Sequence, residues 1–318
     1  MSTADAAGRP PRLGIVGAGS ITNAHIPALM ELGIGTVAAF SRSGVTPLVD
    51  RYGVQACDSF DELLTVCDIV VICTPTPTHL EYIEAALRAG RDVICEKPIV
   101  RTASDGARIA ELADAAGRHV YPAHVVRWFP EYAAMKASVD AGRVGTPTRL
   151  ELTRVGEFPA GAAWFADDTQ SGGVVLDLMI HDLDIARWIA GDIVEVRAVA
   201  ESGTASGARH ASAEATLAHV GGAVSVVTAR WGEPGTAFRT EARVVGTRGE
   251  VTAGGAGDPV AGALGSSESP YTGQLRDLIA AIGGGPKPRV SLADGIHAVE
   301  LAEAVTAAAA SGDVVRLR

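Results

Sequence analysis

The feature that most constrains the fold is a regular alternation of short apolar runs with amphipathic stretches between Arg12 and Pro122. Each apolar run is typical of a strand, and each amphipathic stretch is typical of a helix. We expect strands at residues 12–16, 36–40, 69–73, 92–95 and 119–121, separated by helices at 21–32, 46–52, 60–65, 78–89 and 102–116. Strands and helices that alternate at this spacing form a doubly wound parallel sheet. The sequence therefore predicts an α/β domain over residues 12–125, preceded by a disordered leader at 1–11.

The pattern changes after about Gly145, where longer β-prone stretches are joined by glycine-containing turns. These stretches lie at residues 147–155, 195–201, 213–217, 223–231, 240–245 and 314–317, with helices expected at 173–190, 271–282 and 292–310. Such connections are typical of a mainly antiparallel sheet. The stretch 253–269 is rich in glycine, alanine and serine, and we expect it to form a surface loop. Residues 126–318 are thus predicted to form an α+β domain, whose last helix could pack back on the first domain.

The composition limits the possible partners. The 318 residues are 47% hydrophobic and 20% charged, which is typical of a globular protein with a proper core. A net charge of −10 argues against nucleic acid or an anionic membrane as the main partner. No apolar run reaches the length of a membrane span and no secretory signal is found, so we expect a cytoplasmic protein. The four cysteines lack the spacing of zinc ligands, so we expect reduced, buried thiols and no metal site.

A glycine-containing loop follows the first expected strand and leads into a helix. Gly17 and Gly19 would permit a tight turn, and the backbone of Ser20 and Ile21 would meet a pyrophosphate at the helix N-terminus. The third glycine of the usual fingerprint is replaced by Thr22. A plain strand-to-helix turn is the alternative. The position of the loop after the first strand of an alternating series favours a Rossmann dinucleotide site.

The end of the second expected strand bears on the choice between NAD and NADP. An acidic residue there would bind the ribose 2′-hydroxyl of NAD, but this chain has Ser41 and Arg42. A hydroxyl and a guanidinium suit the 2′-phosphate of NADP. The alternatives are that Arg42 is solvated or stacks on the adenine. The sequence favours NADP, with NAD as the second choice.

The loop after the strand at 69–73 is shaped by prolines. Ligands of open α/β sheets bind at the carboxyl ends of the strands, so we expect Thr74, Pro75 and His79 to lie along the cofactor. We expect His79 to pack or to contact the cofactor edge rather than to act as a catalyst.

The next strand ends in Glu96-Lys97-Pro98, at the same edge of the expected sheet. The Lys97 ammonium could polarise a ketone or stabilise a forming alkoxide. Glu96 could fix the lysine or contact the nicotinamide ribose, and the Lys97–Pro98 bond could be cis. Taken alone, such a tripeptide forms an ordinary salt bridge in a loop more often than it acts as a catalyst.

A second polar cluster lies about 80 residues further along the chain. On an ideal helix Asp177, His181 and Asp184 would lie at about 0°, 40° and −20°, and Asp182 would point elsewhere as a structural residue. Polar groups on an apolar helix are costly to bury without partners or a task. Histidine beside a carboxylate can pass the proton when an alcohol is oxidised. A metal site and a salt-bridged core helix are the alternatives.

Two further residues are candidates for substrate contact. Arg127 lies where the chain leaves the first domain, and could hold a substrate oxygen or bridge the two domains. The aromatic pair Trp164-Phe165 could form one wall of a sugar-sized pocket, or could belong to the core.

Taken together, these features resemble the Gfo/Idh/MocA family, the glucose–fructose oxidoreductase and inositol dehydrogenase group. The resemblance rests on Gly17-Ala18-Gly19, Glu96-Lys97-Pro98, Arg127 with Pro130, and Gly172-Gly173 leading to Asp177, His181 and Asp184. It implies a C-terminal domain with a large open sheet, which binds substrate and supports a homodimer or homotetramer. It also implies hydride transfer between a nicotinamide and a sugar, cyclitol or related polyol. By the same resemblance, Lys97, Asp177 and His181 would line the reacting carbon.

The sequence thus predicts an NAD(P)-dependent dehydrogenase or reductase acting on a secondary alcohol. Lys97 would polarise the oxygen, His181 would carry the proton, and Asp177 would position substrate and imidazole. One alternative is an enzyme that retains its cofactor and cleaves a glycoside through transient oxidation. Another is a sensor that binds the dinucleotide without catalysis.

Overall fold

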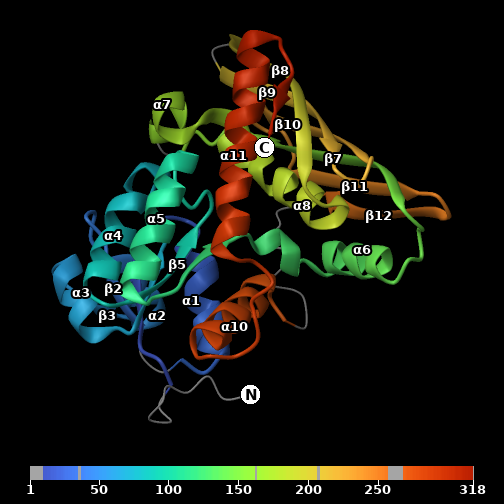
Figure 1. The fold of residues 1–318 in the computed structure, drawn as a ribbon. Coiled ribbons are helices and arrows are strands. Elements are labelled where there is room, and N and C mark those ends of the chain that lie inside the picture. Colours follow the sequence, from blue (N-terminus) through green and yellow to red (C-terminus); the bar gives the residue numbers. More distant parts are fainter. Residues whose placement is uncertain (1–9, 35–36, 162, 206–207, 257–267, 318) are drawn as a thin grey trace. The chain divides into compact units, whose positions relative to one another are not determined.

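A computed structural model describes residues 10–34, 37–161, 163–205, 208–256 and 268–317 of the chain (Figure 1). The chain divides into two compact units, which we describe separately. The first comprises Met1–Val125 with Leu264–Ile296, and the second comprises Val126–Ala263 with His297–Arg318. The sequence pattern assigns all of 126–318 to the second domain, whereas helix α10 (Pro270–Ile282) belongs to the first unit because it packs against α1 (Thr22–Glu31).

The first unit is built on a parallel sheet of six strands in the order β3-β2-β1-β4-β5-β6. The strands are β1 (Leu13–Val16), β2 (Val37–Phe40), β3 (Gln55–Ala56), β4 (Ile69–Ile72), β5 (Asp92–Glu96) and β6 (Val120–Ala123). The connecting helices are α1, α2 (Thr46–Tyr52), α3 (Phe60–Val66), α4 (His79–Arg88) and α5 (Ala103–Ala116). All residues of β1, β4 and β5 are buried, as expected for a sheet covered on both faces. The predicted α/β fold is confirmed.

The strand order reverses between β1 and β4, the two central strands. Connections leave in opposite directions at such a point, so a crevice opens outside the carboxyl ends of the two strands. Gly17 follows β1 and Thr74 follows β4, so both lie at this point.

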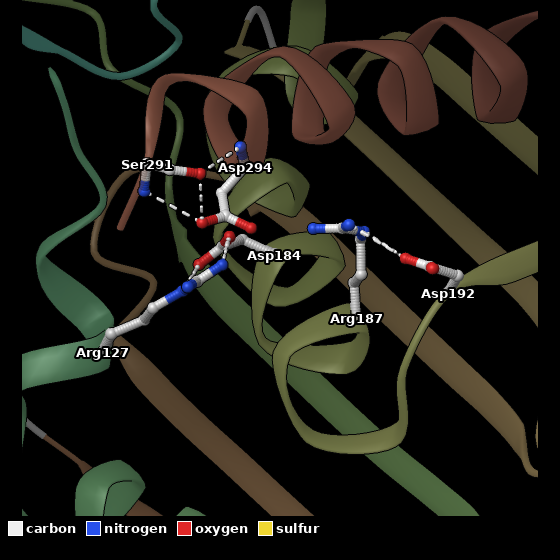
Figure 2. A network of polar contacts seen from close by, with 6 residues as sticks. All are labelled: Arg127, Asp184, Arg187, Asp192, Ser291 and Asp294. Atoms are coloured by element: carbon white, nitrogen blue, oxygen red, sulfur yellow. Dashed lines mark hydrogen bonds and ion pairs between the residues drawn. The ribbon is translucent and has the colours of Figure 1, made fainter. Parts of the chain in front are cut away.

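The helix α11 (Leu292–Ser311) begins in the first unit with a reciprocal cap. The backbone N–H and hydroxyl of Ser291 donate to one Asp294 carboxylate oxygen at 2.9 and 2.8 Å, and the Asp294 N–H donates back to Ser291 Oγ (Figure 2). In the next turn Gly295 packs so closely on Pro122 of β6 that a Cβ atom would lie 2.7 Å from that ring. The start of the last helix therefore packs on the edge of the parallel sheet.

The second unit contains a sheet of seven strands in the order β12-β11-β7-β10-β9-β8-β13. The strands are β7 (Pro147–Glu157), β8 (Ile193–Ala205), β9 (Ala208–His219), β10 (Val224–Gly232), β11 (Arg239–Gly246), β12 (Gly249–Ala256) and β13 (Val315–Arg316). Strands β7 and β10 pair in parallel, and every other pair is antiparallel. The predicted large, mainly antiparallel sheet is confirmed.

Three helices of the second unit differ from the sequence prediction. The helix α6 (Pro130–Asp140) was not expected, and it packs against β12. The single helix expected at 173–190 is divided into a π-helical turn (Val175–Met179) and α8 (Ile180–Ala190), and an unexpected short helix, α7 (Asp168–Ser171), precedes it. The start of the expected 253–269 loop belongs to β12, and residues 257–267 lie outside the described residues.

In the part of the chain that the structure describes, no helix is both long and apolar enough to cross a membrane. Within the same residues, no group of three or more histidine, cysteine, aspartate or glutamate side chains could hold a metal ion. The four cysteines are free and buried.

Candidate active site

The loop after β1 has the backbone geometry of a dinucleotide site. Gly17 adopts a φ of 111°, which only glycine tolerates readily, and its N–H donates to the Phe40 carbonyl at 2.9 Å. A Cβ atom on Gly17 would lie 2.5 Å from the Cys73 carbonyl oxygen at the end of β4. A Cβ atom on Gly19, in contrast, would meet nothing within 4 Å. The first glycine is thus required by the fold, and the second leaves open space above the loop.

The hydrogen-bond donors of this loop fit a pyrophosphate. The backbone N–H groups of Gly19, Ser20 and Ile21 donate to no other described residue, and they precede the N-terminus of α1. Free N–H groups and the helix dipole together favour an anion at that position. Thr22, which replaces the third glycine of the fingerprint, is buried and donates from Oγ1 to the Gly17 carbonyl at 3.3 Å. The replacement therefore stabilises the turn without blocking it.

Arg42, which follows β2, pairs with an acidic side chain of the first unit. Its Nη2 donates to both Glu81 carboxylate oxygens at 2.8 and 3.0 Å, and its guanidinium lies over the Tyr82 ring. The pKa of Arg42 is raised, mainly by the hydrogen bond to Glu81. Both side chains of the pair are about three-fifths exposed, at 61% and 62%. Ser41 Oγ lies 3.0 Å from Ser43 Oγ and accepts the Ser43 N–H, so it shapes the turn beside Arg42.

His79 joins the loops that follow β4 and β5. Its Nε2 lies 2.9 Å from the Thr74 carbonyl oxygen and its Nδ1 lies 2.8 Å from the Pro98 carbonyl oxygen. Burial lowers the pKa of His79, although the two carbonyls favour the charged ring. Since both ring nitrogens are engaged, His79 has no free nitrogen for proton transfer. It holds the Thr74–Pro75 loop in place, as expected for a packing residue.

The loop after β5 carries Glu96 and Lys97, and the Lys97–Pro98 peptide bond is cis. Glu96 is buried, and its Oε1 lies 2.7 Å from His25 Nε2, while its Oε2 accepts the Lys97 backbone N–H at 3.1 Å. Burial opposes ionisation, but the His25 hydrogen bond and the nearby charges outweigh it, so the pKa of Glu96 lies below its ordinary value. Lys97 itself is half-buried. Glu96 is therefore ionised, and its carboxylate orients the backbone of Lys97.

Asp177 and His181 lie on consecutive helical segments of the second unit, and both are partly exposed. Asp177 belongs to the π-helical turn, where the chain rotates by less than 100° per residue, so the angles of an ideal α-helix do not apply to it. Such turns occur frequently at functional sites. Asp182 is buried against Arg154, which donates to its two oxygens at 2.9 and 2.8 Å, as a structural residue would be.

Arg127 and Asp184 form a second buried ion pair (Figure 2). Arg127 donates from Nε and Nη2 to the two Asp184 oxygens at 2.9 and 2.6 Å, and its guanidinium lies over the Trp188 ring. Both side chains are only 3% exposed. At the end of α8, Arg187 donates to Asp192 in the same view. This geometry favours a structural role for Arg127 over substrate contact, and it removes Asp184 from the expected catalytic stripe.

Trp164 lies in a short 3-10 helix (Ala163–Ala166) and stacks on Phe165 at a ring separation of 3.9 Å. Phe165 in turn meets the buried Trp231 edge-on, at 6.2 Å. Both Trp164 and Phe165 remain partly exposed. The two rings therefore form a partly exposed aromatic surface, and Phe165 packs it against the buried Trp231.

The structure thus groups the expected residues within each unit. In the first unit, Gly17, Thr74 and His79 surround the ends of β1 and β4, and the Glu96–Lys97 segment follows β5. Two residues that the sequence analysis missed are His25 and Glu81. His25 is a single histidine on an apolar helix face, and Glu81 lies in the first turn of α4, so neither carried a local signal.

Two family models match this chain. The first, described as an oxidoreductase family with an NAD-binding Rossmann fold, matches residues 11–124. The second, described as the GFO/IDH/MocA C-terminal domain, matches residues 132–252. The chain belongs to the Gfo/Idh/MocA family. The resemblance seen in the sequence motifs is thereby confirmed.

Similar Gfo/Idh/MocA proteins include an inositol 2-dehydrogenase of Rhizobium meliloti, 30% identical over 57% of this chain and 55% of that protein. The chain therefore spans about half the length of the curated relatives that it matches first. The rhizopine catabolism protein MocA of Rhizobium meliloti is 26% identical over 93% of this chain and 94% of its own length. In structure, the chain resembles the WlbA dehydrogenase from Bordetella pertussis, crystallised with NADH and UDP-GlcNAcA. That likeness has a TM-score of 0.86 at 19% identity, over 100% of this chain and 99% of that one.

Proposed function

We propose that this chain is an NAD(P)-dependent dehydrogenase or reductase that acts on a secondary alcohol or ketone of a sugar, cyclitol or nucleotide-sugar-like substrate. The observation that carries the proposal is the set of groups at the carboxyl ends of β1, β4 and β5. There the loop at Gly19 presents free backbone N–H donors. Two strands away lies Lys97, whose backbone N–H donates to the Glu96 carboxylate. In an open α/β sheet this edge is where a dinucleotide and its substrate bind.

The chemistry is divided between the cofactor and the chain. When bound, the nicotinamide accepts or donates the hydride. We assign to Lys97 the polarisation of the substrate oxygen, because its ammonium favours the negative charge that develops there. We assign to His181 the transfer of the hydroxyl proton, and to Asp177 the orientation of the imidazole and the substrate. Residues 12–125 would bind the dinucleotide and 126–318 the substrate.

The substrate class follows from the relatives and from one surface. Several relatives are named inositol 2-dehydrogenases, and WlbA was crystallised with a nucleotide sugar. The partly exposed Trp164 offers a flat ring, supported by Phe165, against which the C–H face of a sugar or cyclitol could pack. We propose a homodimer or homotetramer formed through the seven-stranded sheet. We also propose a cytoplasmic location, which the free cysteines fit.

For the cofactor we propose NADP, bound through Ser41 and Arg42, with NAD as a usable second cofactor. The Arg42–Glu81 pair is exposed, and exposed ion pairs contribute little to stability, so a 2′-phosphate could take the place of Glu81. Arginine binds phosphate through paired, charge-assisted hydrogen bonds. Glu81 would then act as a competitor that weakens the preference for NADP.

The proposal is tested with the purified chain, NAD and NADP, and a panel of sugars, cyclitols and nucleotide sugars. Formation of the reduced nicotinamide is followed by absorbance. We expect turnover with at least one polyol, and a loss of about 100-fold or more in Lys97→Ala and His181→Ala. The matched controls are Lys287→Ala, which removes an exposed lysine, and His297→Ala, which removes a partly exposed histidine.

Turnover within twofold of wild type in both Lys97→Ala and His181→Ala would remove these residues from the mechanism. Cleavage of a glycoside without net change in the dinucleotide would replace the proposed reaction with transient oxidation.

A further inference from the structure

A fully buried histidine lies behind the loop that carries Lys97. His25 belongs to α1, has 0% exposure, and places its Nε2 at 2.7 Å from Glu96 Oε1. Its ring packs edge-on against Tyr271 of α10 at 5.6 Å. Its other nitrogen, Nδ1, is also buried and has no hydrogen-bond partner among the described residues. Among the described residues, the imidazole therefore makes one hydrogen bond, to Glu96.

The direction of this hydrogen bond follows from the charge of Glu96. The pKa of Glu96 lies below its ordinary value, because the hydrogen bond and the charges around it outweigh the effect of burial. Glu96 is then a carboxylate at neutral pH and only accepts hydrogen bonds, so the hydrogen lies on His25 Nε2. A buried carboxylate without a donor would be costly, and a charge-assisted hydrogen bond offsets that cost. His25 thus keeps Glu96 ionised in the interior.

The same carboxylate reaches the lysine loop from its other side. Glu96 Oε2 accepts the backbone N–H of Lys97 at 3.1 Å, so Glu96 bridges α1 and the residue after β5. The helix α1 begins directly after the Gly19–Ile21 loop, whose N–H groups fit a pyrophosphate. One buried carboxylate therefore connects the expected dinucleotide loop to the expected reacting lysine.

We propose that His25 is a positioning residue, which holds the Glu96 carboxylate and, through it, fixes the backbone of Lys97 for the reaction. His25 does not itself contact the substrate. The inference rests on the role of Lys97 given in the proposed function. It adds that the orientation of the lysine depends on a residue of α1, 72 positions earlier in the chain by numbering.

Two substitutions separate the hydrogen bond from the volume of the ring. His25→Leu fills the space without a donor, whereas His25→Gln can present an amide N–H to Glu96 Oε1. We expect His25→Leu to lower kcat about 10- to 100-fold with less than about threefold change in KM for the dinucleotide, because misplaced groups slow the chemical step. We expect His25→Gln to recover most of kcat. His219→Leu is the matched control, because it removes a buried histidine of the β9–β10 hairpin that is hydrogen-bonded to Gly191 and Ser225.

A second readout needs neither cofactor nor turnover. In protein labelled with ¹³C at the glutamate side chains, the Glu96 carboxylate signal is assigned by its loss in Glu96→Gln and is followed against pH. We expect its titration to move upward by about 1 pH unit or more in His25→Leu, and to stay unchanged in His219→Leu. The other titratable groups that influence this region are Lys97, His79, Cys73 and Cys95, and all of them remain in each variant.

The outcomes distinguish the inference from the proposed function. An unshifted Glu96 titration in His25→Leu, or a shifted titration with kcat within twofold of wild type, would overturn the positioning role. If Lys97→Ala turned over like the wild type, the role that the proposed function gives to Lys97 would fail, whatever the Glu96 titration showed. Should His25→Leu not fold, His25→Asn replaces it, because its shorter amide cannot span the distance to Glu96 Oε1.

Discussion

Replacing Gly17 by alanine tests the geometry of the dinucleotide loop most severely. The backbone at Gly17 has a φ of 111°, and holding an L residue in such a region costs about 1–3 kcal/mol. The new Cβ atom would also lie 2.5 Å from the Cys73 carbonyl oxygen and 3.0 Å from the Thr74 nitrogen. Both atoms belong to the backbone and cannot rotate away, and overpacking of this kind costs about 1–3 kcal/mol more. We therefore expect Gly17→Ala to lower the free energy of unfolding by about 2–6 kcal/mol.

The assay is urea unfolding followed by circular dichroism, with Gly19→Ala as the control. Nothing lies within 4 Å of a Cβ atom at Gly19, so that variant should unfold within about 1 kcal/mol of the wild type. It should nevertheless bind dinucleotide more weakly, because the methyl group lies where the backbone would approach the pyrophosphate. If Gly17→Ala were as stable as Gly19→Ala, the close approach of β1 to β4 at this loop would be refuted.

Three other predictions follow from named contacts. Arg42→Asp should raise the Kd for NADP about tenfold or more relative to the Kd for NAD, and Glu81→Gln should lower the Kd for NADP, as measured by fluorescence titration. Equal effects on both cofactors would contradict the 2′-phosphate assignment. Asp182→Ala should lower the free energy of unfolding by about 3–5 kcal/mol, because it leaves Arg154 charged and unpaired in the interior; a loss below about 1 kcal/mol in urea unfolding would show that this pair is solvated. Burial lowers the pKa values of His79 and His219 below the value of about 6.5 in the unfolded chain, so their contribution to stability is complete above that pH and is lost as the pH falls. The melting temperature should therefore decrease between about pH 6.5 and 5, and an increase on acidification would contradict these environments.

The sequence predicts those parts of the fold that carry a local pattern. The apolar strands β1, β4 and β5 are continuous buried runs, so their place in a parallel sheet follows from the sequence alone. The strand β3 has only two residues, Gln55 and Ala56, and both are exposed, so no pattern marks it. The helix α10 has a clear amphipathic pattern, but its packing on α1 in the first unit is a tertiary choice that the pattern does not encode.

The candidate site shows the same limit. The motifs around Gly17 and Lys97 can be recognised in the sequence because each follows an expected strand. Side chains that pair across long stretches of the chain cannot be recognised in this way. The sequence could not show that Arg127 meets Asp184 or that Arg42 meets Glu81, because each contact depends on the folded chain. The stripe of Asp177, His181 and Asp184 was inferred for an ideal α-helix, and the π-helical turn at Val175–Met179 changes that geometry. The π-helical turn does not alter the pattern of polar and apolar residues, so the sequence did not predict it.

The central claim is that this chain moves a hydride between a polyol carbon and a nicotinamide. It is tested most directly with cyclitols and sugars deuterated at their C–H positions, incubated with the chain and the oxidised dinucleotide. The dinucleotide is then isolated and examined by mass spectrometry and proton NMR. We expect one deuterium at C4 of the nicotinamide, with the rate of transfer lowered about 100-fold or more in Lys97→Ala. Oxidised polyol formed without deuterium in the dinucleotide, or no oxidation of any polyol by a chain that binds the dinucleotide, would contradict the account.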